Sequence, residues 1–439
     1  MTETVHREPD AGPEEADDAV APVVHHPFTR DVVQCPHPHF ARMRRDQPLY
    51  PVADLPFHVV SRYEDVTSIA SRPEDFPSAR SSPGYAAIDY FPTDPDVVAI
   101  YAQAQAPGVL GHADKPAHTR QRKHVQQWFT PRKIRSMWQD VIDQVTDELI
   151  SDFERAGTVD MMTQFAIPLP VKVIARILGF GDSSVGDLKR WSDAYLKSPA
   201  GSSSREVWMH RAHDHVDAQR FLQGQIQDRL DDPGRDDLLS ELVASTAEGG
   251  STDDEPLTLD EVRSITNQLL VAGNETTTQL IGQTVYALAR HPDVLQRLEA
   301  DPALVDKVVE EGLRYTSPVT GLYRYAADDT EVNGSPVAKD DVLFVLWASA
   351  NRDEALFAEP DGFDIDRENV HKHVAFGTGM HFCVGANLAR AEARTGIARL
   401  VERVPGLRVR PGFEPDYGAT LSNRMLLTLP MEFDPGAMG

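Results

Sequence analysis

The sequence predicts a mainly α-helical protein with a smaller β region. The first observation is a run of about 32 residues from Thr258 to Pro292, enough for a helix of about 48 Å at 1.5 Å per residue. The second is helical periodicity through most of the stretch from His118 to Asp231. The third is a set of short alternating stretches beside turn residues, such as Asn333-Gly334, which is typical of hairpins. We therefore expect one helix that crosses the molecule, with strands in the minority.

The chain of 439 residues divides into a tail and one domain. Its first 20 residues contain seven acidic residues, one arginine and almost no apolar run. Such a segment cannot bury enough surface to become ordered, so residues 1–26 are expected to be a disordered acidic tail. No Gly/Ser-rich linker divides the remainder, and residues 27–439 are expected to form a single domain.

Elements within this domain follow from periodicity and its breaks. Residues 48–66 alternate as a short hairpin does before a helix start. Ser81 to Asp114, rich in Pro, Gly, Asp and Tyr, is expected to be a long loop. Helices are expected at 116–129, 133–157 and 168–180, and in an amphipathic run that ends near Asp231.

The second half of the chain has a helix start of its own. Thr258 and Glu261, three residues apart, form a capping box that marks the beginning of the long central helix. Later elements are expected as a helix over 303–315, a hairpin at Asn333-Gly334, a helix after Cys383, and strands at 407–412 and 425–433.

Charge and composition exclude several classes of protein. With 43 basic and 68 acidic residues the net charge is -25, so nucleic acid is not an expected partner. The chain has no uncharged apolar run of about 18 residues and no signal-like start, so no membrane association and a cytoplasmic location are expected. Two cysteines, Cys35 and Cys383, exclude a disulfide framework.

The middle of the expected central helix is poorly suited to a buried helix. "LLVAGNETTTQLIG", residues 269–282, combines apolar flanks with glycine, asparagine, an ionisable group and three threonines. Glycine costs about 1 kcal/mol in a helix interior, and a buried carboxylate costs more unless it is paired. Residues that lower stability at such a place predict a functional site.

A second unusual stretch is "FGTGMHFCVG", residues 376–385, in front of the last helix. It is not a dinucleotide fingerprint, because the third glycine is absent and no βαβ unit surrounds it. Glycines around one cysteine would allow a flat macrocycle to lie against the backbone, and a thiolate there can hold haem iron. A buried structural cysteine is the alternative reading.

These residues resemble the haem-binding loop of the cytochrome P450 superfamily, and Leu388-Ala389-Arg390 continues the match. The resemblance covers the chain from Pro27 to its end and implies the cytochrome P450 fold, with the long helix across the haem. It also implies a structural network, because Glu311 and Arg314 share a helix face. Arg367 matches the position that completes this network. A Glu-x-x-Arg pair alone would more often be a solvated pair.

The resemblance also implies a cofactor and the residues that bind it. The cofactor would be haem b, with Cys383 as catalytic thiolate ligand to the iron and O2 as co-substrate. Further residues implied at the haem are His118, Arg122, Ala272, Gly273, Arg324, Phe376, His381 and Gly385. Buried haem carboxylates need cationic or hydrogen-bonding partners, which is a physical reason for the histidines and arginines in this set.

Catalytic roles for Glu275 and Thr276 are implied by the match of "AGNETT" to the family's oxygen-binding segment. Small residues before them would let dioxygen approach the helix. A threonine hydroxyl that leaves its backbone partner could open a local groove. Thr276 would then hydrogen-bond the oxygen being reduced, while Glu275 would connect to a proton relay.

The activity implied is hydroxylation or epoxidation of an apolar small molecule, in specialised metabolite synthesis or catabolism. The same haem fold could instead perform phenol coupling, nitration or peroxide-driven oxidation, and a non-enzymatic haem or ligand-binding protein is the third reading. The substrate pocket would draw on 81–111, 191–208, 269–276 and 319–323. Its nearest residues would be Leu269, Ala272, Val319, Thr320, Leu322 and Tyr323.

Electrons would come from NAD(P)H through a ferredoxin reductase and a ferredoxin, because the chain has no fused reductase. A basic patch near the cysteine side of the haem would steer an acidic ferredoxin to the protein. The protein is expected to be a monomer. The residues expected in it are Arg120, Lys123, Arg132, Lys133, Arg135 and Lys372. An ordinary mixed surface is the alternative.

Two histidine groups raise the question of a metal site. His37 and His39 follow Cys35, and His210 to His215 holds histidines at helical spacing. Neither group completes a ligand set of known spacing, so both are interpreted as ordinary side chains.

Overall fold

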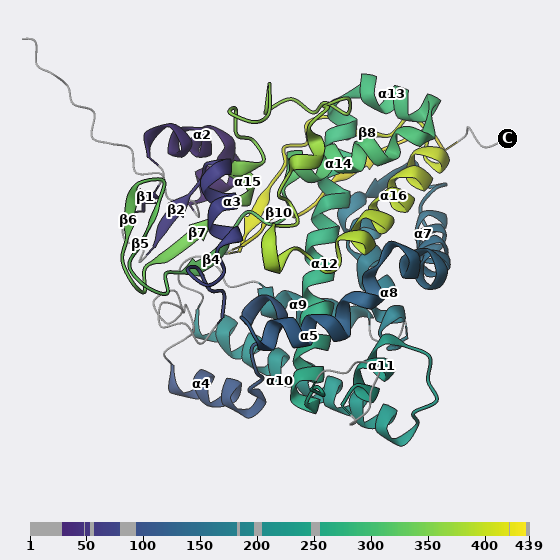
Figure 1. Ribbon diagram of the computed structural model, residues 1–439. Helices are drawn as coiled ribbons and strands as arrows, with labels where there is room; N and C mark the ends of the chain where they lie inside the picture. The colour runs from purple at the N-terminus through teal and green to yellow at the C-terminus, as the bar shows by residue number, and fades with distance from the viewer. Residues whose placement is uncertain are drawn as a thin grey trace, which may run out of the picture.

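The computed structural model describes residues 29–435 apart from 48, 53–56, 80–93, 182–184, 197–203, 247–254 and 421. Helices dominate and strands form a smaller part, so the predicted fold class is confirmed (Figure 1). The acidic tail expected over residues 1–26 lies outside the described residues. The single domain over 27–439 stays a prediction.

Helix α12, Leu259–Arg290, is the predicted central helix and passes through the middle of the molecule (Figure 1). It has 32 residues. The Thr258 hydroxyl accepts from the N–H of Glu261 at 3.1 Å, and the Glu261 carboxylate accepts from the N–H of Thr258 at 2.9 Å. The helix ends at His291, and Pro292 begins α13, Pro292–Ala300. The capping box and both helix ends are therefore as predicted.

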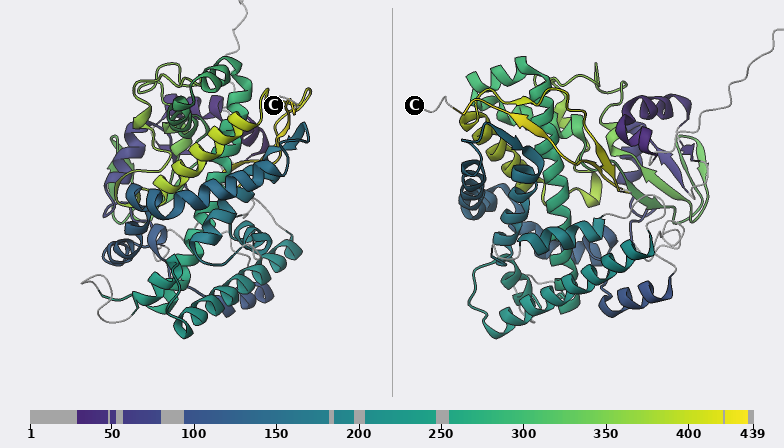
Figure 2. Two further views of the ribbon diagram at one scale, coloured as in Figure 1. Left: turned by 90° about the vertical axis from the view of Figure 1, so that its right-hand side faces the viewer. Right: turned by 180° about the vertical axis from the view of Figure 1, so that it is seen from behind.

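The largest apolar cluster is built where other helices pack around α12 and around one another. Both views of Figure 2 show α12 enclosed by its neighbours. The helices that contact it are α8 (Pro168–Ile177), α9 (Val185–Leu196), α10 (Arg205–Asp231), α11 (Leu238–Ala244), α13, α14 (Val305–Thr316) and α16 (Ala386–Arg403). Burial on all sides explains why α12 tolerates apolar residues around nearly its whole circumference.

The predicted helices of the first half are present, with interruptions. The expected run over 116–129 is α5, Ala117–Gln126, followed by a 3₁₀ turn. The run over 133–157 begins earlier, in α6 (Pro131–Lys133), because the Thr130 hydroxyl caps its start. A π-helical turn over Ile134–Trp138 then precedes α7, Gln139–Ser151, which packs against α8 and α16.

The long loop expected between Ser81 and Asp114 is partly wrong. It contains α4, Pro95–Tyr101, and two 3₁₀ turns, whereas residues 81–93 lie outside the described residues. The helix forms because the Asp94 carboxylate accepts from the N–H groups of Asp96 and Val97, and because Pro95 suits the first helical position. These local signals outweigh the loop-like composition.

A four-stranded sheet lies to one side of the helices, with α2 (Pro36–Asp46) and α3 (Tyr63–Ser71) beside it (Figure 1). Its order is β1-β2-β7-β4, with β2 and β7 parallel and the other pairs antiparallel. The strands are β1 (Leu49–Pro51), β2 (His58–Val60), β7 (Val342–Val345) and β4 (Leu322–Tyr325). The predicted hairpin over 48–66 is β1 and β2, followed by α3.

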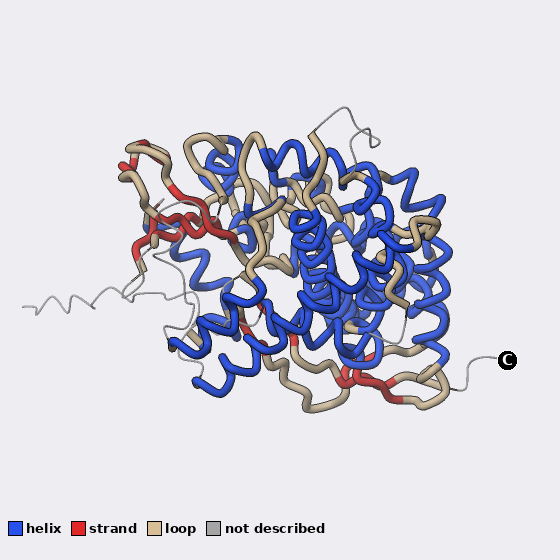
Figure 3. Tube along the Cα trace, turned by 90° about the horizontal axis from the view of Figure 1, so that it is seen from below, coloured by secondary structure: helices blue, strands red, loops and turns tan. Residues whose placement is uncertain are grey.

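The remaining strands form three small groups. One group lies beside the four-stranded sheet, because its Val332 and Val337 share an apolar cluster with Val60 and Leu343. Figure 3 shows another strand region on the opposite side of the molecule. β5 (Thr330–Val332) and β6 (Ser335–Val337) form the predicted hairpin, because Asn333 and Gly334 both have positive φ, 49° and 75°, as its turn requires. The other pairings join β9 (Tyr417–Ala419) to β10 (Arg424–Leu426), and β11 (Pro430–Glu432) to β3 (Thr158–Asp160) and β8 (Arg408–Val409). The one strand expected over 425–433 is therefore two.

Candidate active site

A cavity separates the middle of α12 from the loop that carries Cys383. Both unusual stretches of the sequence face this cavity, although they are about a hundred residues apart. Of the residues predicted at the site, those that line it are Leu269, Ala272, Gly273, Thr276, Val319, Leu322, Arg324, Phe376, His381, Cys383 and Gly385. The fold therefore brings most of the predicted residues around one space.

The loop before α16 is held in one shape by its own backbone. The N–H of Cys383 donates to the carbonyl of Phe376 at 2.9 Å. Gly377 and Gly379 have φ of 68° and 71°, a region that disfavours side chains. A Cβ on Gly379 would also lie 2.4 Å from the carbonyl oxygen of Ala70. Both the backbone conformation and this close approach therefore require glycine at position 379. The result is a bare backbone surface beside the cysteine.

Opposing effects act on the thiol of Cys383. Burial raises its pKa above the usual value. Hydrogen bonds from the backbone N–H groups of Gly385 and Ala386, and the charges of Arg122 and Arg390, act in the other direction. The N–H groups and the arginines stabilise a negative charge on the sulfur, as expected around a thiolate ligand. A metal ion bound to the sulfur would deprotonate it outright.

Four cationic or potentially cationic groups gather at one end of the cavity. His118 is buried, and its ring lies edge-on to that of His381 with the centroids 4.6 Å apart. Arg122 donates to the carbonyl of Met380 at 3.4 Å. Arg324 reaches the same region from β4 and is buried as well. The structure thus brings together the four residues predicted to bind haem carboxylates.

Burial in this region lowers the pKa values of His118, His381 and Arg324. Burial, with the charges of His381 and Arg122, lowers the pKa of His118 to about 4. Burial also lowers the pKa of His381, and that of Arg324 to about 10. In addition, the Nδ1 atoms of His118 and His381 are buried without a hydrogen-bond partner among the described residues. An anionic group at this place would satisfy them.

Asp114 supports this group of residues and was not predicted. Its carboxylate lies 3.7 Å from Nε2 of His381 and accepts from the N–H groups of Ser78 and Ala79. Burial opposes its ionisation, but the nearby imidazole of His381 and the hydrogen bonds from these N–H groups outweigh burial and hold the pKa of Asp114 below its usual value. Nothing in the local sequence distinguishes Asp114 from other loop aspartates.

The middle of α12 leaves room on its cavity side. Ala272 is exposed to the cavity, and a Cβ on Gly273 would meet no heavy atom within 4 Å. The Thr276 hydroxyl donates to the carbonyl of Ala272 at 2.8 Å, and the helix is continuous through this region. The expected local groove, with the hydroxyl away from its backbone partner, is therefore not present. Bonding to the i−4 carbonyl satisfies the hydroxyl within the helix.

Glu275 is buried and is not part of the cavity lining. Its carboxylate accepts from Nε2 of Gln279 at 3.0 Å and lies 3.8 Å from Nζ of Lys189. Lys189 also pairs with Asp193. The buried carboxylate therefore has a hydrogen-bond donor and a nearby cation, and these offset the free-energy cost of its burial. Lys189 was missed, because the stretch from 181 to 204 has no pattern that singles it out.

Two of the predicted substrate residues, Thr320 and Tyr323, are not at the cavity. Tyr323 packs its ring against Phe57 and Phe344, with centroid distances of 5.4 and 4.9 Å. Side chains alternate along a strand, so Leu322 and Arg324 face the cavity and Tyr323 faces the other way. The main chain of Thr320 bonds to Ser422 and Ala348, and its side chain is not part of the cavity lining.

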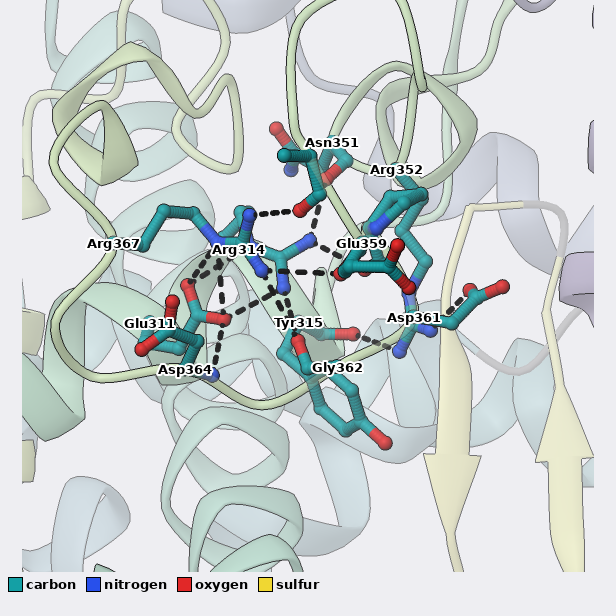
Figure 4. Close-up of polar contacts among 12 residues, drawn as sticks. Glu311, Arg314, Tyr315, Asn351, Arg352, Glu359, Asp361, Gly362, Asp364 and Arg367 are labelled. Atoms are coloured by element: carbon teal, nitrogen blue, oxygen red, sulfur yellow. Dashed lines mark hydrogen bonds and ion pairs between the residues drawn. The ribbon is translucent and has the colours of Figure 1, made fainter.

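The predicted structural network is assembled in the interior, as Figure 4 shows. Nε and Nη2 of Arg314 donate to the Glu311 carboxylate at 2.8 and 2.6 Å, and Nε of Arg367 lies 3.3 Å from it. Arg314 also donates to the carbonyls of Asn351, Pro360 and Gly362. The network therefore joins α14 to the long segment before the cysteine loop, and it lies outside the cavity.

No group of three or more potential metal ligands of the His, Cys, Asp or Glu type occurs among the described residues. Cys35 is exposed, and His210 to His215 lies on α10. Neither histidine group forms a ligand set in the described part of the chain.

Comparisons with known proteins agree with this architecture. A family model described as Cytochrome P450 matches residues 56–404. Cytochrome P450 107B1 of Saccharopolyspora erythraea is 35% identical over 379 residues, 85% of this chain and 88% of that protein. Vitamin D(3) 25-hydroxylase of Pseudonocardia autotrophica is 33% identical over 416 residues, 94% of this chain and 97% of that protein. CYP109E1 from Bacillus megaterium, solved in complex with testosterone, has a TM-score of 0.81 and 29% identity, over 92% of this chain and 100% of that chain.

The chain belongs to the cytochrome P450 family. Its relatives include proteins named as monooxygenases and hydroxylases, and it is an oxidoreductase of the P450 monooxygenase class. The family implies haem, iron held by a cysteine thiolate, and the use of O2. No helix within the described ranges has the length and apolar character needed to cross a membrane.

The residues around the cavity fit this cofactor. The sulfur of Cys383 is a soft ligand of the kind that holds haem iron. The bare glycine backbone and the space in front of Gly273 leave room for a flat macrocycle between them. The unpartnered imidazole nitrogens and the buried Arg324 match two carboxylates.

Proposed function

We propose that this enzyme hydroxylates or epoxidises an apolar small molecule, with electrons from NAD(P)H delivered through a ferredoxin reductase and a ferredoxin. The observation that carries the proposal is one cavity that combines Cys383, the Thr276 segment of α12 and a set of apolar side chains. A cysteine ligand, an acid–alcohol pair and an apolar surface are the parts that such a reaction needs.

Haem would be held from two sides. Cys383 would bind the iron, while His118, Arg122, Arg324 and His381 would bind the carboxylates of the macrocycle. When bound, haem supplies the activation of dioxygen, and the protein supplies orientation and protons. Ala272 and Gly273 would leave space on the α12 side, as their exposure to the cavity supports.

Proton delivery is assigned to the acid–alcohol pair. The Thr276 hydroxyl, which faces the cavity, would hold a proton where oxygen is reduced. Glu275, behind it, would pass protons from the surface, because its contact with Lys189 leads to a side chain that is 21% exposed. This assignment rests on geometry and on the match of the segment to the family.

The substrate is proposed to be apolar, because Leu269, Val319 and Leu322 line the cavity and Leu322 is 42% exposed. Two of the compared proteins support this class: one is named for vitamin D(3), and the other was solved with testosterone. The site of oxidation on the substrate is not assigned. A cytoplasmic location and a monomeric state stay predictions from the sequence.

The test is the absorption spectrum of the dithionite-reduced, haem-loaded protein under carbon monoxide. Wild type should show a strongly red-shifted Soret band, and Cys383→Ala should lose it while still binding haem. Wild type that binds haem without this band would remove the thiolate assignment. Thr276→Ala is the matched variant: it should keep the band but consume more O2 and NADPH per product.

The stoichiometry with a converted substrate then separates the proposed reaction from its alternative. Monooxygenation consumes one O2 for each oxygenated product. Phenol coupling or peroxide-driven oxidation would give products with no oxygen atom from O2. Labelling with ¹⁸O2 and mass spectrometry of the product distinguishes them.

A further inference from the structure

A second cavity, of about 430 Å³, lies apart from the haem site. It is enclosed by the start of α2, the last turns of α12 and α14, and strands β9 and β10. It shares no lining residue with the first cavity. Its polar lining includes His37, Arg290, His291, Thr316, Arg352 and Arg424.

The charge of this lining is opposite in sign to the net charge of the whole protein. The chain has a net charge of -25, yet three arginines and two histidines line the cavity and no carboxylate does. Asp361, outside the lining, pairs with Arg352 at 2.8 Å (Figure 4). Asp416, also outside, accepts from Gln34. One of the three guanidinium charges is thus balanced.

The other two arginines have no carboxylate partner among the described residues. Arg424 donates to the carbonyls of Val33 at 2.6 Å and Gln34 at 2.9 Å and stacks on the ring of Tyr417. These contacts fix its position without neutralising its charge. Arg290 is the last residue of α12, and its side chain is exposed and makes no ion pair or hydrogen bond within the described part of the chain. A fixed charge and an available one therefore converge on the cavity.

Several polar atoms of lining residues are buried and have no partner in the described structure. These are Nδ1 of His37, Nε of Arg352 and Oγ1 of Thr316. Arg352 is 5% exposed, so its unpaired N–H is enclosed by protein. Buried polar atoms of this kind cost free energy unless a ligand or water bonds to them. The atoms thus indicate an occupant with hydrogen-bond acceptors.

His37 lies at the cavity with its side chain partly buried next to positive charges. Burial first, and then the charges of Arg352 and Arg424, with those of Arg44 and Arg314 behind them, lower its pKa well below the usual value. His37 is therefore neutral, and its ring can either donate or accept. The phenol rings of Tyr286, Tyr315 and Tyr417 complete a wall that suits a planar group beside the anion.

We propose that this second cavity binds a small oxyanion, a free phosphate or the carboxylate of a small organic acid, between Arg290, Arg352 and Arg424. Guanidinium groups recognise both kinds of oxyanion with charge-assisted hydrogen bonds. The site does not depend on the haem reaction proposed above, because no lining residue is shared.

The experiment is isothermal titration calorimetry of the haem-loaded, full-length protein with inorganic phosphate and, separately, with benzoate, at constant ionic strength. Saturable binding of either probe is expected, and the better probe identifies the kind of oxyanion. Arg290→Gln should weaken binding about tenfold or more, since one charge-assisted contact is lost. Thr316→Val should also weaken it without lowering the unfolding midpoint, because the hydroxyl has no protein partner to lose.

The matched control is Arg155→Gln, which removes an exposed arginine that makes no ion pair or hydrogen bond among the described residues and does not line the cavity. It should leave the affinity unchanged. Absence of saturable heat with both probes would overturn the proposal, as would equal losses in Arg155→Gln and Arg290→Gln. An anion effect on the carbon monoxide spectrum would place the anion at the haem site instead, and would overturn it too.

Discussion

Glu392 is a single carboxyl group placed among apolar side chains. It lies on α16, is 2% exposed and lines the haem cavity. Burial raises its pKa to about 8, and a hydrogen bond with Thr277 reduces this shift only in part. Between the unfolded pKa and this value the folded protein holds a proton that the unfolded chain releases. The group therefore lowers stability, increasingly as pH rises from about 4.5 to about 8.

We expect Glu392→Gln to raise the free energy of unfolding by about 1–3 kcal/mol at pH 8. The amide keeps the shape and has no charge to bury. Below about pH 4.5 both forms are neutral, so the two proteins should have the same stability. Urea unfolding of haem-loaded wild type and variant at several pH values measures this. A constant difference across the pH range would show that the pKa of Glu392 is the same in the folded and unfolded protein, and would contradict this prediction.

At the residue scale, the chemistry was easier to predict than the positions around it. Cys383 and Thr276 were identifiable because the short segments around them resemble segments of a known family. The prediction of Tyr323 at the cavity was wrong, because the register of a strand decides which of its side chains face the cavity, and the sequence does not give this register. Lys189 and Asp114 were missed because ion pairs between distant segments depend on the tertiary fold.

At the scale of an element, α12 carries a chain of side-chain amides next to the segment that is proposed to be catalytic. Nε2 of Gln283 donates to Oε1 of Gln279 at 3.0 Å, and Nε2 of Gln279 donates to Glu275 at 3.0 Å. Gln279 also accepts from the N–H of Leu426 at 2.8 Å, which ties the chain to β10. Spacing of four residues puts these side chains on one helix face. The arrangement holds the Glu275 carboxylate in one orientation.

We expect Gln279→Met to slow product formation about tenfold while the carbon monoxide spectrum stays as in wild type. Glu275 would lose its short hydrogen bond and keep only the 3.8 Å contact with Lys189. The solvent isotope effect in D2O should rise, since proton delivery would become slower than other steps. Gln283→Met is the control, one bond further from the acid. An unchanged isotope effect in Gln279→Met would argue against a role in proton delivery.

Elements were predictable where their signals are local. The capping box and the terminal proline gave α12 both of its ends. In contrast, α4 lies in a stretch whose composition resembles a loop, and only the Asp94 cap and Pro95 at the first helical position indicate a helix. β10 and β11 were expected as one strand, because apolar alternation continues across the residues where the chain changes partner. Pairing between strands is a property of the fold, not of the segment.

At the scale of the whole molecule, exposed arginines lie in the α6 region, next to the cysteine loop, although the protein as a whole is acidic. Asn387, at the start of α16, donates to the carbonyl of Phe129 at 2.9 Å and so ties the α6 region to that loop. Arg132 and Arg135 in this region are exposed and make no ion pair among the described residues. Arg120, also expected in the basic patch, pairs with Glu261 instead. Two arginines thus remain for the proposed contact with an acidic ferredoxin.

We expect the double variant Arg132→Glu, Arg135→Glu to slow reduction by an acidic ferredoxin about tenfold at low salt, because attraction becomes repulsion. Added salt should reduce the difference, since the Debye length falls to about 3 Å at 1 M. Stopped-flow reduction under carbon monoxide measures the rate. The control is Arg220→Glu on α10, an exposed arginine that lies 3.8 Å from Asp217. Each Arg→Glu change lowers the net charge by two, so a total-charge effect alone would slow reduction in the control about half as much, on a logarithmic scale, as in the double variant. That outcome would show that this surface is not the docking site. If neither variant slows reduction, the electron donor binds elsewhere.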